Sequence, residues 1–132
     1  MRKKLLALLL ILVMITFAVS GCKKSNTIKI GTIMSTSGPV STYGIQTRDA
    51  IKMAIEEINE QGGILGKKVE LIVEDDEKNP EKTMNALIKL ATKDKVKVVL
   101  GALTSDCTLA ITKEAQQRGI LLFTPTSTSD AV

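Results

Sequence analysis

Serine and threonine hydroxyls gather in three segments of this 132-residue chain, residues 35–44, 103–106 and 126–129, and each segment follows an apolar run. Hydroxyl groups and the free N–H groups at a helix start together bind small anions such as a carboxylate. Serine and threonine also form turns and helix caps, so each loop alone has a purely structural explanation. Three such loops at one edge of a sheet would favour a site for a small polar ligand.

Other side-chain chemistries find less support. The absence of histidine excludes Ser-His-Asp and Cys-His nucleophiles, and imidazole metal sites, from this chain alone. The acidic run 74–77 resembles a cation or phosphoacceptor site, but such a run at a strand exit is more typical of a solvated face. Cys107 lacks a histidine or basic neighbour to activate it, so we expect a buried or half-buried free thiol. Phosphate-cradling glycine motifs are missing, and we expect no cofactor and no metal.

The amino terminus has the layout of a secretory signal. Three basic residues precede an apolar run over residues 5–19, and the chain turns polar at Lys23. This run is short for a membrane span, which needs about 20 apolar residues, and a retained membrane anchor is the alternative. Without those three basic residues the chain carries 15 basic and 14 acidic residues, which does not indicate a basic partner surface. No basic cluster is interleaved with aromatics, so we expect no nucleic-acid partner.

The residues that end the apolar run, Val19-Ser20-Gly21-Cys22, resemble the lipobox of bacterial lipoproteins. The resemblance implies that Cys22 becomes the first mature residue and carries lipid on its sulfur and its amine. Several acyl chains hold a protein stably at a membrane. Cys107 would then be the single cysteine of the mature chain, with no partner for an internal disulfide. We therefore expect a lipoprotein signal peptide over residues 1–21 and a lipid-anchored tether over residues 22–27.

Hydrophobic patterning in the rest of the chain predicts alternating strands and helices. We expect strands at 28–33, 68–73, 96–101 and 120–123, and helices at 45–61, from the Asn79-Pro80 cap to about 91, and from about 106 to 119. In the first helix, the apolar stripe is expected to comprise Ile51, Ala54, Ile55 and Ile58. Strict alternation with short loops predicts an α/β fold, a doubly wound parallel sheet with helices on both faces. Ligands bind at the carboxyl ends of the strands in such sheets, where the hydroxyl-rich loops would lie.

Several short segments of this sequence follow one another in an order that is typical of one protein family. They are Ile28-Lys29-Ile30-Gly31, Ser37-Gly38-Pro39, Tyr43-Gly44, residues 54–59, Gly62-Gly63-Ile64, Gly66, Asp75-Asp76, Pro80, residues 98–101 and Thr124-Pro125. This ordered set, which spans almost all of residues 28–129, resembles the amino-terminal lobe of ABC transporter substrate-binding proteins of the branched-chain amino acid (Leu/Ile/Val-binding) type. The resemblance implies a Rossmann-like lobe of a type 1 periplasmic-binding fold, here residues 28–132. Members of the family are far longer, so we expect the second lobe to be missing and this lobe to be partial.

In that family two lobes close on a free amino acid, and the resemblance implies a role for each matching residue. Ser105 would donate to the ligand carboxylate through its hydroxyl and its amide, as would Thr128. Thr126 would offer its backbone carbonyl to the ammonium group, and Tyr43 would pack its ring against the ligand side chain. The other expected ligand-binding residues are Leu103, Thr104 and Ser127.

Together these features predict an extracytoplasmic solute-binding lipoprotein, held by lipid at Cys22 on the outer face of the bacterial cell membrane. It would deliver an amino acid, or a related small zwitterion or amide, to an ABC permease and perform no covalent chemistry. Two alternatives remain at this point. One is the ligand-sensing domain of a receptor, and the other is a small hydrolase that uses Ser105 or Cys107.

Overall fold

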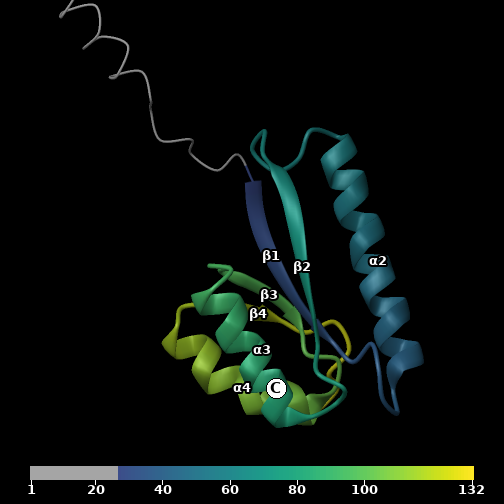
Figure 1. Ribbon diagram of the computed structural model, residues 1–132, viewed down its shortest axis with the longest axis vertical. Coiled ribbons are helices and arrows are strands. Elements are labelled where there is room, and N and C mark those ends of the chain that lie inside the picture. Colours follow the sequence, from purple (N-terminus) through teal and green to yellow (C-terminus); the bar gives the residue numbers. More distant parts are fainter. Residues whose placement is uncertain (1–26) are drawn as a thin grey trace, which may run out of the picture.

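Parallel strands and helices alternate along residues 27–132, the part of the chain that the computed structural model describes (Figure 1). The elements are β1 (Thr27–Met34), α2 (Ser41–Glu60), β2 (Lys68–Asp75), α3 (Pro80–Thr92), β3 (Val98–Gly101), α4 (Ser105–Gln117) and β4 (Leu121–Phe123). The strands form one sheet in the order β2-β1-β3-β4, and every pair is parallel. The predicted α/β class with a parallel sheet is confirmed. The predicted signal peptide, Cys22 and the tether up to residue 26 lie outside the described residues.

The strand order places the helices on both faces of the sheet. The chain moves from β1 to β2 in one direction and then returns past β1 to β3 and β4. Because such crossovers are almost always right-handed, the reversal puts α2 on one face and α3 with α4 on the other (Figure 1). The strand order therefore reverses between β1 and β3, which is where a doubly wound sheet binds its ligand.

The hydrophobic core lies between the sheet and the layer of α3 and α4. Its buried members are Ile33, Ala86, Leu87, Leu90, Val96, Val99, Ile111, Ala115 and Ile120. The predicted cap of α3 is confirmed, since Asn79 Oδ1 accepts hydrogen bonds from the backbone N–H groups of Glu81 (2.9 Å) and Lys82 (3.1 Å). Capping and core burial together fix α3 at the end of β2, next to the loop that follows β1.

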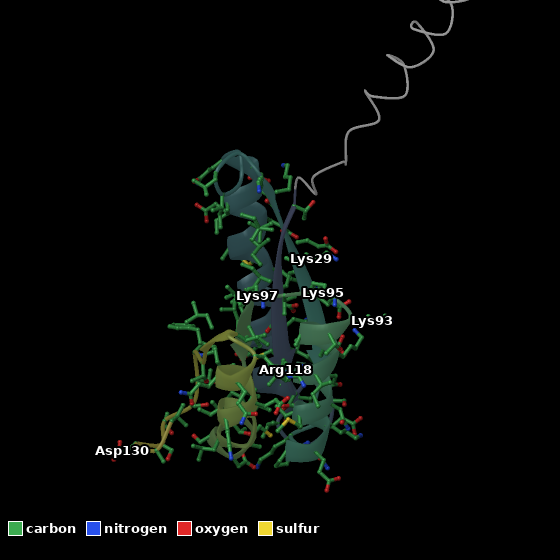
Figure 2. The ribbon with its side chains drawn as sticks, turned by 90° about the vertical axis from the view of Figure 1, so that its left-hand side faces the viewer. Lys29, Lys93, Lys95, Lys97, Arg118 and Asp130 are labelled. Carbon is green, nitrogen blue, oxygen red and sulfur yellow. The ribbon has the colours of Figure 1, made fainter. Side chains whose placement is uncertain are left out.

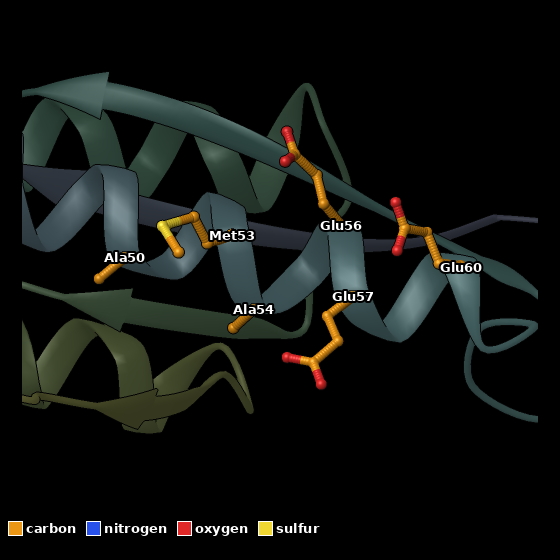
Figure 3. A pocket seen from close by; sticks show the side chains of 6 residues that line it. All are labelled: Ala50, Met53, Ala54, Glu56, Glu57 and Glu60. Atoms are coloured by element: carbon orange, nitrogen blue, oxygen red, sulfur yellow. The ribbon is translucent and has the colours of Figure 1, made fainter.

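The other face of the sheet is covered only in part, because α2 packs mainly on β1 and β2. Ile55 is buried as predicted, but the prediction is wrong for Ala54, which is exposed, and for Ile58, which is 36% exposed. Nothing in residues 27–132 packs against this side of α2. Figure 3 shows the exposed side of the helix, where three apolar side chains are followed by three acidic ones: Ala50, Met53, Ala54, Glu56, Glu57 and Glu60. Within the described residues no helix is both long and apolar enough to span a bilayer.

Candidate ligand-binding site

A cavity of about 270 Å³ lies at the carboxyl edge of the sheet, where the loops after β1, β3 and β4 meet. Its lining residues are Val40, Tyr43, Gln46, Thr47, Leu103, Thr104 and Thr126. Four of the predicted site residues are thus brought together, although residues 43, 103 and 126 are far apart in the sequence. Sequence reasoning missed the other three, two of which were within reach. Gln46 and Thr47 follow Tyr43 by three and four residues on α2, the spacing that places side chains on one face of a helix.

Thr104 lines this cavity, but its hydroxyl oxygen is buried. Its Oγ1 atom is shielded from solvent and lacks a partner in good hydrogen-bond geometry among the described residues, although the Asp106 carboxylate and the Cys107 thiol lie near it. Thr104 also precedes the first turn of α4 and makes no side-chain cap. The first N–H groups of a helix have no acceptor within the helix, so this end of α4 favours a negatively charged group.

Ser105 and Thr128 form a second feature beside the cavity but do not line it. Ser105 Oγ accepts hydrogen bonds from the backbone N–H groups of Thr128 (3.2 Å) and Ser129 (3.3 Å). A serine hydroxyl that accepts two bonds still has its own proton to donate. The loop after β4 is therefore attached to the start of α4, with the Ser105 proton available to a ligand.

The remaining hydroxyls of the loop after β4 stabilise the loop itself. Thr126 Oγ1 donates to the carbonyl oxygen of Leu103 at 2.5 Å. Ser127 Oγ lies 2.8 Å from both Thr108 Oγ1 and Thr124 Oγ1. The bond from Thr126 to Leu103 holds the loop after β4 against the loop after β3 and so fixes the position of the Thr126 carbonyl. The side-chain contacts of Ser127 are all within the protein and do not support its predicted ligand-binding role.

The predicted solvated face over residues 74–77 is wrong for Asp76, which is fully buried. Asp76 Oδ1 accepts hydrogen bonds from Ser35 Oγ (2.6 Å) and from the backbone N–H of Lys78 (3.0 Å), while Thr83 Oγ1 lies 3.0 Å from Oδ2. Partners from the loop after β1, the loop after β2 and α3 therefore meet on one carboxylate. In residues 27–132 no group of three or more histidine, cysteine or acidic side chains is arranged to hold a metal ion.

Asp75, by contrast, is exposed, and its carboxylate holds the loop after β1 by accepting hydrogen bonds from the backbone of that loop. Its Oδ1 atom accepts hydrogen bonds from the N–H groups of Thr36 and Glu77, both at 3.0 Å. Partial burial would raise the pKa of Asp75, but hydrogen bonds from Ser37, Glu77 and Thr36 outweigh it and hold the pKa below its ordinary value of 3.8. The ionised form of Asp75 is therefore the one that the fold stabilises.

We expect Asp75 to contribute to the acid sensitivity of the fold. A carboxyl whose pKa is lowered by folding adds stability above pH 3.8, and that stability is lost as the pH falls through the folded-state pKa. Replacement of Asp75 by asparagine should therefore flatten the loss of unfolding free energy in urea titrations at successively lower pH. Asp49→Asn, which removes an exposed carboxylate paired with Arg48 on α2, is the control and should keep the wild-type slope. Identical slopes for wild type and Asp75→Asn would contradict this role.

Cys107 is a free, fully buried cysteine in α4, as predicted. Burial raises the pKa of its thiol, so the reactive thiolate is disfavoured at neutral pH. The thiol is therefore a small apolar core group rather than a nucleophile.

The fold and the cavity define a class of protein: an α/β lobe that presents a hydroxyl-lined pocket at the point where the strand order of its parallel sheet reverses. Comparison with known proteins agrees with that class. The sequence model of a family described as periplasmic binding protein matches residues 27–132. The chain belongs to this family.

Curated relatives match the chain over most of its length. It is 37% identical to a Leu/Ile/Val-binding protein of Rhizobium johnstonii over 77% of this chain and 28% of the relative. It is 34% identical to a leucine-, isoleucine-, valine-, threonine- and alanine-binding protein of Pseudomonas aeruginosa over 82% of this chain and 29% of the relative. The chain thus spans under a third of the length of these relatives.

Solved structures show the same lobe. The branched-chain amino acid transporter substrate binding protein of Streptococcus pneumoniae, in complex with isoleucine, superposes with a TM-score of 0.77 at 35% identity, over 79% of this chain and 30% of that chain. A solute binding protein of an ABC transporter from Rhodopseudomonas palustris, in complex with 3,4-dihydroxybenzoic acid, gives a TM-score of 0.71 at 29% identity, over 77% of this chain and 28% of that chain. The described residues therefore have the type 1 periplasmic-binding lobe that the sequence predicted.

Proposed function

We propose that this chain is the amino-terminal ligand-binding lobe of an extracytoplasmic solute-binding protein that delivers an amino acid to an ABC transporter. The observation that carries the proposal is the cavity at the sheet edge, in which Tyr43, Leu103, Thr104 and Thr126 meet. The names of the relatives and structural neighbours support the same solute class.

The carboxylate is the ligand group for which the site has the clearest chemistry. Isoleucine and 3,4-dihydroxybenzoic acid, the ligands of the two structural neighbours, have little in common except a carboxylate. In this chain the Ser105 proton, the amide groups at the start of α4 and the Thr128 hydroxyl would bind it. The Thr128 amide, which was also predicted to bind the carboxylate, donates to Ser105 Oγ instead. The Thr126 carbonyl would accept from the ammonium group of an amino acid.

The rest of the ligand would lie over Tyr43, whose side chain is 69% exposed at the mouth of the cavity. An aromatic ring contributes a large apolar contact area, which suits a branched aliphatic side chain. Tyr43, Gln46 and Thr47 form one wall of the cavity and the loops after β3 and β4 form the other. We propose that a second lobe closes over this open site.

We also propose that residues 1–21 are removed as a signal peptide and that Cys22 carries lipid at the start of a tether over residues 22–27. The protein would then be held on the outer face of the cell membrane, close to the permease that it serves.

The two alternatives are distinguished by chemistry and by topology. A hydrolase would need a base beside Ser105, but the chain has no histidine, and Ser105 Oγ accepts two backbone hydrogen bonds. We therefore propose that the protein carries out no covalent chemistry. A receptor domain would need a membrane-spanning segment to signal across the bilayer. A lipid on the lipobox-like Cys22 would anchor the protein without such a segment, which favours a free lipoprotein.

Ligand binding provides the test. We expect L-isoleucine or L-leucine to raise the melting temperature of the full-length protein, because a ligand at about 100 times its Kd adds about 2.7 kcal/mol to the free energy of unfolding. Isoleucinamide and the corresponding amine, which lack the carboxylate, should give a much smaller shift. Ser105→Ala should weaken binding by about tenfold or more in calorimetric titrations, since a hydrogen bond to a charged group is lost.

Thr112→Ala is the matched control, because it removes a hydroxyl from the same helix that donates to the Thr108 carbonyl and lies outside the cavity. It should bind like the wild type. If no amino acid in a broad panel shifts the melting temperature, the proposed solute class is wrong.

A further inference from the structure

Four exposed lysines lie together at the opposite end of the sheet from the cavity. Lys29 is in β1, Lys93 follows α3, and Lys95 and Lys97 lead into β3. Together with Thr27, Ile28 and Asp94 they line a shallow depression of about 490 Å³, and Figure 2 shows them on one side of the molecule. We call Lys29, Lys93, Lys95 and Lys97 the lysine patch. The near-neutral charge of the mature sequence did not indicate a basic surface, and for this patch that expectation is wrong, because the fold brings distant lysines together.

The positive charge of the patch is not neutralised by its described neighbours. None of its four lysines forms an ion pair with a residue of the described part, 27–132. Asp94, the acidic residue within the depression, is paired with Lys89 at 3.3 Å. Glu70 is aligned with Lys29 on the neighbouring strand, and the charge of nearby Lys68 offsets it. The patch therefore has an excess of positive charge that faces solvent.

The position of the patch relative to the start of the chain indicates what it would meet. Thr27, the first residue of β1, borders the depression, and Cys22 precedes it by five residues. A chain extends by at most about 3.6 Å per residue, so Thr27 at the edge of the patch lies within about 18 Å of Cys22. Lys23 and Lys24 add two more positive charges to the intervening sequence. A lipid on Cys22 would thus hold these charges close to the bilayer surface.

We propose that the lysine patch binds the surface of a bilayer that contains anionic phospholipids. Each lysine or arginine close to a surface of anionic headgroups contributes about 1 kcal/mol, or about fivefold in affinity. Lysines without interleaved aromatic side chains suit a charged surface, whereas nucleic acid binding normally adds stacking. The proximity argument rests on the proposed anchor at Cys22, but the charge of the patch does not.

This contact would set the orientation of the lobe. The lysine patch lies at the amino end of β1 and the cavity at its carboxyl edge, and eight residues of parallel strand span about 26 Å. With the patch on the bilayer, the cavity faces away from the membrane and is open to solutes. Because salt screens exposed charges within about 8 Å at physiological ionic strength, the contact is weak and reversible, which allows the lobe to leave the surface and reach a permease.

Lysine footprinting tests this orientation with the full-length mature protein, added to vesicles of phosphatidylglycerol and phosphatidylcholine or of phosphatidylcholine alone. We expect the acetylation rates of the four patch lysines to fall about threefold or more on the anionic vesicles only, and the protection to disappear at about 1 M salt. Four exposed lysines elsewhere should react equally under all conditions: Lys52, Lys78, Lys82 and Lys113. Equal protection on neutral vesicles, or protection that persists at high salt, would overturn the proposal.

A charge-matched pair of variants completes the test. Replacement of all four patch lysines by glutamine should lower affinity for anionic vesicles about tenfold or more, whereas the same replacement of the four control lysines should not. Equal losses would mean that only net charge matters and would overturn the specific patch. The intact mass of the protein tests the anchor separately, because a Cys22 without lipid would contradict the proposed anchoring. The protection of the patch lysines would still decide whether the lysine patch binds the bilayer. Thermal melts of both variants verify that they are folded.

Discussion

Asp76→Ala is expected to lower the free energy of unfolding by about 3 kcal/mol, one of the two largest single-residue effects that we expect in this lobe. The carboxylate is fully buried and accepts hydrogen bonds from Ser35 Oγ and the Lys78 N–H, with Thr83 Oγ1 at 3.0 Å. Alanine would leave the buried Ser35 hydroxyl without its acceptor, and a buried donor without a partner costs about 1–3 kcal/mol. The Lys78 N–H would keep Ser35 Oγ (3.1 Å) and Thr83 Oγ1 would keep the Asn79 carbonyl (2.8 Å). The urea midpoint of the full-length protein should fall accordingly, with little change in the slope of the transition.

The conservative variant separates the charge from the shape of the side chain. Asp76→Asn keeps one acceptor oxygen but turns the other into an NH₂ donor, which would face either Ser35 Oγ or Thr83 Oγ1. We expect an intermediate loss of stability. Asp49→Ala, at an exposed position of α2, should change stability by no more than about 0.5 kcal/mol. If Asp76→Ala were as mild as this control, the buried network would not stabilise the fold.

The fold was predictable because local signals and the global pattern agree. The start of α3 at Asn79-Pro80 and the apolar runs of the strands can each be predicted from neighbouring residues. The strict alternation of strands and helices then implies a parallel sheet. The exposed side of α2 was not predictable. A helical stripe shows which residues share a face, but whether that face is covered depends on what packs against it, and here Ala54 is uncovered.

The site was predictable in part for a similar reason. The rule that ligands bind at strand ends, together with the family resemblance, identified four residues that line the cavity. The buried state of Asp76 depends on Ser35, which is 41 residues away, and on the local bend of the chain at the end of β2. Likewise, the lysine patch forms from positions that only the sheet brings together. Contacts of this kind have no signature in a window of neighbouring residues.

Gly44→Ala is expected to destabilise the protein by about 3 kcal/mol and also to weaken ligand binding. Gly44 is buried in the first turn of α2, and a Cβ atom at this position would lie 1.9 Å from the carbonyl oxygen of Ser35. This oxygen belongs to the backbone of the loop after β1, and the same residue is held by its hydroxyl to buried Asp76. Because the loop cannot yield easily, the start of α2 must move instead.

That displacement should reach the cavity, since α2 contributes Tyr43, Gln46 and Thr47 to its wall. Gly31→Ala is the matched control, because its Cβ would meet only the end of the Leu90 side chain, at 2.9 Å, and a side chain can change its rotamer. Urea unfolding identifies the conditions in which each variant is still folded, and calorimetric titration under those conditions measures its affinity for the ligand. We expect Gly44→Ala to bind more weakly than both the wild type and Gly31→Ala. Unchanged affinity in Gly44→Ala would mean that α2 does not position the ligand. A loss confined to this glycine would show that the close approach of α2 to the loop after β1 sets the width of the binding site.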